Sequence, residues 1–503
     1  MPHAGCPRSD HGAVVKTPSI FGATLLQEWR LFQADRLTML ITSILLAAAL
    51  YGLNNGRAAV ERQQRAIAQA EAEEQARLAE QRDNLTAMQE GRYTAATAYR
   101  NPANPLWVGN RHAASYAVLP PAPLALTAIG QSDLNPSYVL VSADSRDTFA
   151  FNEEIENPGN LLIGHFDLAF FVVFLYPLLI IALTYNVLSG ERERGTLAML
   201  MSNPVRLGTV LLGKLVFRAL VVIPPLLLAT MAMIAFDGIS TLLSAEGIAR
   251  CAAWAALITA YGVFWFALAG AVTALGRPSE YNIFVLISLW VVLSLIVPTL
   301  LGVVVNVAHP VPSRVEMINA LRALQTEAGR EYDASAARYQ EEHSALAGGD
   351  GGILNQRDLN AAHRRVRVQQ AAAIAAQELM AQHDERLMRQ QETVTRLRFL
   401  SPAIVVQEGL NDIAGTGNSR YRDYQAQVDR FHAQWRAFFT PKVMENVALT
   451  MEDYDRFPRF RYQPQPLSGW TPALLQALLG LLLPALLLGF AGSRWLSRYP
   501  IRE

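Results

Sequence analysis

The sequence predicts an all-α polytopic membrane protein with six transmembrane helices and two large, mainly helical extracytoplasmic segments, the first with a small β content. Three observations predict this class. Six runs stay apolar over the roughly twenty residues that a helix needs to cross the hydrocarbon core. Two long intervening stretches are rich in Ala, Glu, Gln and Arg. The composition, 51% hydrophobic against 17% charged residues, is the average expected when apolar spans and charged water-facing parts are combined.

The six apolar runs are interpreted as helices, because a lone strand in lipid would leave its backbone groups unpaired. They lie at residues 37–53, 166–188, 215–236, 251–275, 283–305 and 474–490. The prolines inside these runs are expected to kink the spans without ending them. The first run could also be the core of a signal peptide. We favour a span, because the run follows the amphipathic stretch 20–36 (IFGATLLQEWRLFQADR) and continues into a polar helix.

Short basic loops orient the spans, since positive charge collects on the cytoplasmic side. The basic side chains next to the spans fall after the second, between the fourth and fifth, and after the sixth; they are Arg192, Arg194, Arg206, Lys214, Arg277, Arg494, Arg498 and Arg502. The sequence therefore predicts a multi-pass protein of the bacterial cytoplasmic (inner) membrane. Both tails, 1–36 with its interfacial helix and 491–503, are placed in the cytoplasm, and segments 54–165 and 306–473 outside it.

The first extracytoplasmic segment opens with a stretch free of Gly and Pro, residues 57–90, which predicts a helix that prolongs the first span. At 1.5 Å per residue this helix would project about 50 Å. The part that follows is punctuated by prolines and contains a β-like run at 138–141, which is typical of a small compact lobe.

The second extracytoplasmic segment predicts an antiparallel helical hairpin. Residues 315–347 and 356–400 have helical composition, and the sequence GGDGG at 348–352 separates them. In the second arm an apolar residue recurs every seven positions, at Leu359, Val366, Ala373, Met380, Leu387 and Val394. This single column favours a short coiled contact between the arms. Beyond Pro402 we expect a mixed region that returns to the membrane, with a helix-ending turn at 415–417.

The most informative stretch is the cytoplasmic segment 189–214, SGERERGTLAMLMSNPVRLGTVLLGK. It contains a charged turn, a short amphipathic helix at about 195–201 and a proline turn between two spans. Such a piece lies along the membrane surface and offers both apolar and charged groups to a partner. The alternative is an ordinary interfacial loop whose basic residues only set the topology.

The pattern E-x-E-x-G-T-L, a few apolar residues, a proline and then G-K resembles the coupling-helix region of ABC-2-type transporter permeases. The helix with Glu28, Trp29 and Arg30 and the stretch 157–171 fit the same resemblance. Residues 398–402 (RFLSP), 409–417 (GLNDIAGTG) and 453–460 resemble a subgroup with a large extracytoplasmic domain of unknown function. The resemblance implies that the coupling segment docks on an ATPase, through Glu191, Arg192, Glu193, Arg194, Gly195, Thr196, Leu197, Met199, Ser202 and Pro204.

The same resemblance implies the partners. The chain is expected to be a non-catalytic membrane subunit that holds no cofactor and pairs with a second permease subunit, identical or related. Two ATP-binding subunits would carry the ATP and Mg²⁺. The expected activity is export of an unidentified, amphipathic or lipid-like substrate. Two alternatives are mechanical action on a periplasmic protein without transport, and a membrane-anchored scaffold or receptor.

Several other features argue against further activities. Lys+Arg and Asp+Glu both number 43, so no net field favours nucleic acid. Gly208, Gly213 and Lys214 match G-x-x-x-x-G-K, but Leu215 replaces the Ser or Thr of a phosphate loop. The histidine spacing places no two ligands on one helix face, so no metal site is expected. Arg218 lies one turn inside the third span, either as a functional charge or, as we favour, reaching back to the interface.

Overall fold

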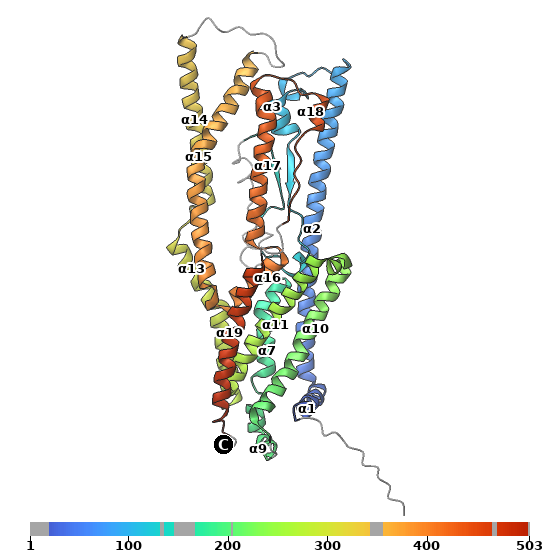
Figure 1. Ribbon diagram of the computed structural model, residues 1–503, viewed down its shortest axis with the longest axis vertical. Helices are drawn as coiled ribbons and strands as arrows, with labels where there is room; N and C mark the ends of the chain where they lie inside the picture. The colour runs from blue at the N-terminus through green and yellow to red at the C-terminus, as the bar shows by residue number, and fades with distance from the viewer. Residues whose placement is uncertain are drawn as a thin grey trace, which may run out of the picture.

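The computed structural model describes residues 20–130, 135–144, 166–202, 205–342, 356–464 and 470–500. The molecule is elongated, with a bundle of apolar helices at one end and long polar helices at the other (Figure 1). Six helices in the described residues are long and apolar enough to cross a membrane. They are Arg36–Gln89 (α2), Leu168–Glu193, Leu207–Gly238, Ala245–Thr273 (α11), Ser279–Ala308 and Thr471–Leu496 (α19). An all-α, multi-pass membrane protein with little strand is therefore confirmed.

Burial divides the six spans into two central and four peripheral helices. The most apolar stretches of Leu168–Glu193 and α11 are 67% and 72% buried, whereas those of the other four are 11% to 28% buried. Side chains such as Phe284, Val303 and Leu486 on the peripheral spans are largely exposed. Apolar side chains in that position are what lipid would cover, as in other membrane bundles.

Helix α2 runs unbroken from the bundle into the polar end of the molecule (Figure 1). Asp35 begins it by accepting hydrogen bonds from the backbone of Leu37 and Thr38. The predicted extension at 57–90 is therefore confirmed to Gln89. Two glycines let neighbouring backbone approach α2: a Cβ on Gly52 would lie 2.8 Å from the carbonyl of Asp167, and one on Gly56 would clash with the carbonyl of Leu126.

Prolines shape two of the spans through wide helical turns. Span Leu168–Glu193 consists of α6 (Leu168–Phe170), the π-turn η4 (Phe171–Leu175), α7 (Tyr176–Thr184) and α8 (Ser189–Glu193). Pro177 follows η4, and Pro298 follows the π-turn η5 (Val292–Ile296) between α12 (Ser279–Val291) and α13 (Val297–Ala308). Proline cannot donate to the preceding turn, so carbonyls are released there. Neighbouring helices use them: the Tyr261 hydroxyl donates to Val173 O at 3.0 Å, and the Ser401 hydroxyl to Leu293 O at 2.6 Å. The prolines therefore join helices instead of ending them.

The remaining elements complete the chain. At the bundle end these are α1 (Ile20–Ala34), α9 (Thr196–Met201) and α10 (Leu207–Leu243), whose helical backbone is interrupted at Gly238. At the polar end they are η1 (Ala98–Arg100), α3 (Pro105–Trp107), η2 (Val108–His112), β1 (Ser115–Val118), β2 (Tyr138–Val141), α14 (Arg314–Glu342), α15 (Gln356–Leu397), α17 (Asn418–Met444) and α18 (Met451–Asp455). Three elements lie where the polar end meets the bundle: η3 (Ala125–Thr127), η6 (Arg398–Leu400) and α16 (Pro402–Ala414).

We call the part of the polar end built from 70–144 and 418–464 the distal lobe. The expected strand at 138–141 is present as β2, and it pairs antiparallel with β1 so that Ser115 faces Val141. One buried cluster joins both halves of the lobe, with Leu85 and Ala117 on one side and Trp435 and Phe439 on the other. The two polar segments, distant in sequence, therefore share a single core.

Helices α14 and α15 form the predicted antiparallel hairpin, and its GGDGG turn lies outside the described residues. The arms meet along only part of the seven-residue column, at Met380. Met317 and Leu321 of α14 pack with Ala376 of α15, while Val366 of the column turns toward Leu106 and Val443 in the distal lobe. The expectation that this column faces the other arm is wrong for its first half, where Leu359 and Val366 pack with Leu106 and Val443.

Helix α16 packs with the membrane helices. Val405, Val406 and Leu410 belong to the same buried cluster as Leu257 of α11 and Leu481 of α19. A Cβ on Gly409 would lie 2.7 Å from the Leu257 side chain. The region after Pro402, expected to be mixed, combines the helices α16, α17 and α18 with non-helical stretches at 445–450 and 456–464.

Candidate functional site

The predicted coupling segment forms a compact projection at the bundle end, which we call the foot and define as residues 189–202. Figure 1 shows α9 at the end of the molecule opposite the distal lobe, near α1 and the C-terminus. The foot consists of α8, a single residue in the left-handed region, Gly195 at φ 73°, and α9. This conformation favours glycine, which explains the residue between the two short helices.

The first glutamate of the pattern is bound within the chain. Glu191 Oε1 accepts from Lys214 Nζ at 2.8 Å, and Glu191 Oε2 accepts from the Thr196 hydroxyl at 2.6 Å. The Thr196 hydroxyl also lies 3.1 Å from Glu191 O. Glu191 thereby fixes α9 against α8 and links both to α10.

Lys214 sits at the centre of a buried charge group. Its Nζ lies 2.8 Å from Glu28 Oε1 of α1 as well as from Glu191, and the Lys214 and Glu28 side chains are only 6% and 7% exposed. Arg218 Nη2 lies 3.8 Å from the other oxygen of Glu28. Two cations and two carboxylates balance one another, as buried charges require. We call these four residues the brace.

Arg218 belongs to this group and is 20% exposed. The expectation that Arg218 reaches back to the interface stays a prediction, and its contact with Glu28 of α1 gives it a structural partner inside the chain.

The next two charges of the pattern bind the turn between α11 and α12. Glu193 accepts from the backbone N and the hydroxyl of Ser279, at 2.8 and 2.9 Å. Arg192 Nη1 donates to Gly276 O at 2.5 Å, and its guanidinium lies 5.9 Å from the ring centre of Tyr499. Ser189, at the start of the foot, contacts the same Ser279 hydroxyl at 2.8 Å.

Leu197 anchors the foot by apolar contact. It is 1% exposed and packs with Val187, Leu207, Leu211 and Tyr499. Because these residues precede α8, begin α10 and follow α19, the foot is packed against three spans as well as bonded to them.

A different set of residues forms the exposed surface of the foot. Met199 is 75% exposed, although buried methionine would be the norm, and Arg194, Gly195 and Ser202 are also exposed. No described residue forms an ion pair with Arg194. Pro204 lies outside the described residues. The nine described residues of the predicted ten therefore separate into an inward set, which contacts other parts of the chain, and an outward set, which does not.

Helix α1 packs on the same end of the bundle. Glu28 faces inward, whereas Trp29 is 47% exposed and Arg30 is exposed. The Trp29 ring lies 6.4 Å from that of Phe217 in α10. A Cβ on Gly213 would lie 3.0 Å from the Thr24 side chain, so α1 approaches α10 closely.

Ser279, Gly276 and Tyr499 carry no signal in the sequence, and Lys214 stands out there as a basic residue next to a span and as part of the G-K pair, not as a buried charge. A lysine that borders an apolar run was the available signal, since such a charge needs a partner. The partner itself lies 186 residues away at Glu28 and was not readable from spacing.

Most polar side chains of the foot are hydrogen-bonded within the chain. In the described part of the chain, no three or more His, Cys, Asp or Glu side chains are grouped so that they could hold a metal ion. Glu191, Arg192 and Glu193 are hydrogen-bonded within the chain, and the exposed groups of the foot include the Met199 thioether, the Arg194 guanidinium and the Ser202 hydroxyl. That combination suits protein contact.

Comparison with known proteins gives one match. Residues 314–463 match a domain of unknown function, DUF3526. The match covers α14 to α18, which are the hairpin, the α16 helix and half of the distal lobe. No curated protein and no solved structure matches the chain.

Proposed function

We propose that the chain is the membrane-spanning permease subunit of an ABC-2-type transporter, coupling ATP hydrolysis by a separate ATPase subunit to export of an unidentified, amphipathic substrate. The observation that carries the proposal is the construction of the foot. Its inward residues join it to several spans, and its outward residues, Met199 and Arg194, are free for a partner.

The brace supplies the path for force in this proposal. A push on the foot reaches α10 through Lys214, α12 through Ser279 and α1 through Glu28. Packed helices move as bodies, so displacement at α9 would swing these helices together. A flexible loop without such contacts would absorb the push.

The membrane orientation follows from the same end of the molecule. Arg194, Arg206, Arg277 and Arg498 lie in or next to the short connections at the foot end, where the positive-inside rule places the cytoplasm. Both termini would then be cytoplasmic, in a bacterial inner membrane, and the distal lobe and hairpin would be extracytoplasmic. Two ATP-binding subunits, with their ATP and Mg²⁺, would dock on the feet of this chain and of a second permease subunit.

A second function is favoured by one specific feature. Helix α2 continues from the first span into the core of the distal lobe, where Leu85 is buried. Motion of that span would therefore move the lobe directly, and the lobe could act on a periplasmic protein without transport. A scaffold or receptor with no ATPase is the third reading.

Co-purification tests the coupling. The tagged chain is isolated in mild detergent from native membranes, and Mg-ATP hydrolysis and nucleotide-binding chains are measured in the eluate. Met199→Glu should lower the recovered ATPase activity at least tenfold, because a carboxylate would replace the exposed apolar group at the proposed contact. Met388→Glu, the same change on an exposed methionine of α15, should leave recovery unchanged.

The result decides between the three readings. Absence of any ATPase in the wild-type eluate, or equal recovery with Met199→Glu, would reject the coupling. If the ATPase is present, the complex is reconstituted in vesicles with a fluorescent phospholipid. ATP-dependent movement of that lipid between leaflets favours export, and hydrolysis without movement favours mechanical action. Charge reversal at Glu191 or Glu193 is unsuitable here, because both carboxylates hold the foot together.

A further inference from the structure

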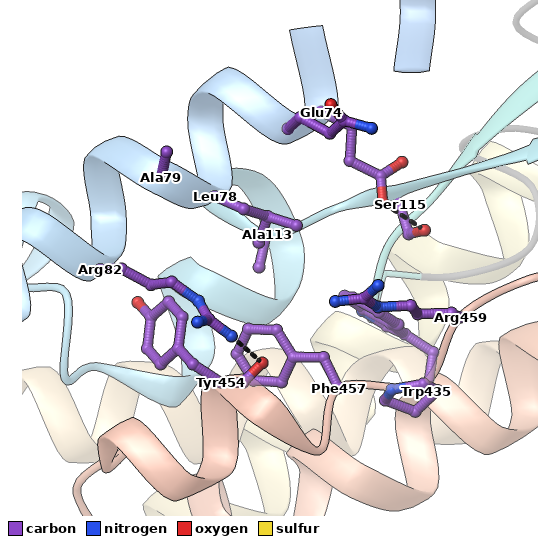
Figure 2. A pocket seen from close by; sticks show the side chains of 12 residues that line it. Glu74, Leu78, Ala79, Arg82, Ala113, Ser115, Trp435, Tyr454, Phe457 and Arg459 are labelled. Carbon is purple, nitrogen blue, oxygen red and sulfur yellow. Dashed lines mark hydrogen bonds between the residues drawn. The ribbon is translucent and has the colours of Figure 1, made fainter. Parts of the chain in front are cut away.

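The distal lobe contains a cleft that the proposed coupling does not use. It lies between α2 and the α17–α18 region, at the opposite end of the molecule from the foot, and has a volume of about 250 Å³ (Figure 2). Its walls come from Leu78 and Ala79 of α2, Ala113 and Ser115 before and in β1, and the residues around Phe457. The two polar segments of the chain thus each supply one side.

The floor of the cleft is aromatic and fixed. Trp435, Tyr454 and Phe457 line it, with Phe457 6.0 Å from Trp435 and 4.7 Å from Tyr454 between ring centres. The Trp435 indole donates to Gly109 O at 2.9 Å, and the Tyr454 hydroxyl to Pro102 O at 2.8 Å. Both polar tips are satisfied outside the cleft, so the ring faces that remain are apolar and preorganised.

Two guanidinium groups lie over this floor. Figure 2 shows Arg82, from α2, and Arg459, beyond α18, extending toward each other across the cleft. Arg82 Nη2 lies 2.6 Å from Asp455 Oδ1 and 3.1 Å from Tyr454 O. No carboxylate among the described residues forms an ion pair with Arg459. One positive charge is therefore left unbalanced beside the rings.

Glu74, the acidic residue that lines the cleft, is already hydrogen-bonded within the chain. Glu74 accepts from the Ser115 hydroxyl at 2.9 Å and from the Tyr116 backbone N at 2.6 Å, so both of its oxygens are bonded. It holds β1 against α2. The cleft as a whole therefore offers an apolar floor with a free cation at one side.

We propose that this cleft binds an aromatic or branched apolar group that carries a carboxylate. The rings would cover the apolar part, and Arg459 would receive the carboxylate in the forked geometry that guanidinium groups favour. The volume sets the size: 250 Å³ falls below the roughly 300 Å³ of the smallest pockets for drug-sized ligands. One side chain with its carboxylate fits this space, whereas a lipid chain does not.

This ligand chemistry has two sources, a free small acid or the C-terminal residue of a polypeptide. The inference does not rest on coupling to an ATPase, since the cleft and the foot share no residue. Failure of one proposal leaves the other intact.

Binding is tested by calorimetry on the full chain in detergent, with N-acetyl-phenylalanine and its amide as the two compounds. The acid should bind at least tenfold more tightly than the amide. Arg459→Gln should weaken binding of the acid at least tenfold and leave the amide unchanged. Ala79→Phe, which fills the cleft from an exposed face of α2, should abolish binding of both.

Arg456→Gln is the matched control. Arg456 lies three residues earlier, is exposed, and pairs with Glu452 outside the cleft. It should bind the acid as the wild type does. No heat of binding with the wild type, or equal affinity for acid and amide, would overturn the proposal.

A hexapeptide ending in phenylalanine, with a free or amidated C-terminus, distinguishes the sources. Tighter binding of the free-acid peptide than of N-acetyl-phenylalanine assigns the cleft to a polypeptide C-terminus. Exclusion of the peptide, with the small acid still bound, assigns it to a free acid.

Discussion

The foot and the distal lobe, at opposite ends of one molecule, are held together by different forces. Against the foot, the brace residue Lys214 of α10 is 6% exposed and has two carboxylate oxygens at 2.8 Å. In the lobe, Trp435, Phe439 and Tyr424 are nearly inaccessible and pack ring against ring. Directional charge pairs shape one end, and apolar burial shapes the other.

The difference teaches what each end is suited to do. Buried ion pairs contribute little net stability but penalise any rearrangement that separates them, so they fix geometry. Apolar burial is non-directional and supplies most of the free energy of folding. The foot is therefore a stiff connection between helices, and the lobe is a stable body that can present a binding cleft.

Removing the largest ring of the lobe is expected to have the largest effect. Trp435→Ala should lower the free energy of unfolding of the lobe by about 4 kcal/mol, because it leaves a cavity in a cluster that joins both polar segments. Pulse proteolysis of the lobe in increasing urea measures the change.

Trp495→Ala is the control at the other end, since that side chain is 43% exposed. It should change lobe proteolysis by less than about 0.5 kcal/mol. If Trp435→Ala were equally mild, the aromatic cluster would not be the source of lobe stability.

Breaking the brace should come second. Lys214→Met leaves Glu28 and Glu191 without their shared cation, and we expect a loss of about 3 kcal/mol, because uncompensated buried charge is costly. Thermal unfolding in detergent measures it. Adding Glu28→Gln should restore part of the loss by removing one of the two carboxylates.

Lys442→Met gives the matched comparison in the lobe. Lys442 pairs with Asp453 at 2.9 Å, but its side chain is 25% exposed, so its loss should cost no more than about 1 kcal/mol. Equal effects of the two lysine variants would remove the distinction between a charged brace and an apolar lobe.

The smallest effect is expected where the two ends are joined. Asp412 lies in the last turn of α16, and burial, together with the nearby Glu408, raises its pKa to about 6. The folded protein therefore holds this proton more tightly than the unfolded chain, and stability falls as pH rises from about 4 through 6. Asp412→Asn should match the wild type at pH 4 and be about 2 kcal/mol more stable at pH 7, as thermal unfolding across that range would record.

Asp333→Asn is the control, because the pKa of Asp333 is shifted in the opposite direction to that of Asp412. Asp333 is exposed, and its hydrogen bonds with Arg364 lower its pKa, so its variant should gain no stability at pH 7. The stability of the wild type could instead stay constant between pH 4 and 7, in parallel with that of Asp412→Asn. That result would show that the Asp412 carboxylate is freely hydrated.

Much of the local structure was predictable from the sequence. The six spans, the helix over 57–90, the strand at 138–141 and the hairpin arms all appear where composition placed them. The turn at Gly415, with φ 75°, ends α16 as its glycine indicated. These features depend on residues close in sequence, whose hydrophobicity, secondary-structure propensity and turn preference can be recognised in the amino-acid sequence.

The neighbours that each side chain contacts were harder to predict from the sequence. Val366 lies in a regular apolar column, yet it packs on the distal lobe and not on the other arm. Glu191 and Glu193 suggest a charged surface, yet Glu191 binds the buried Lys214, and the exposed Glu193 binds Ser279. In both cases the side chain contacts a group that is distant in the sequence, and that contact decides where the side chain lies.

The sequence by itself determined that this is a multi-pass helical membrane protein with polar helices attached, because the length of an apolar run is a local property. Only the tertiary structure decided that residues 70–144 and 418–464 share one core, that α16 joins the membrane cluster, and that a cleft opens beneath Arg459. Those outcomes depend on contacts between residues up to several hundred positions apart, such as the hydrogen bond from the Tyr424 hydroxyl to Ala117 O at 2.7 Å. Contacts of this kind form only when the whole chain is packed.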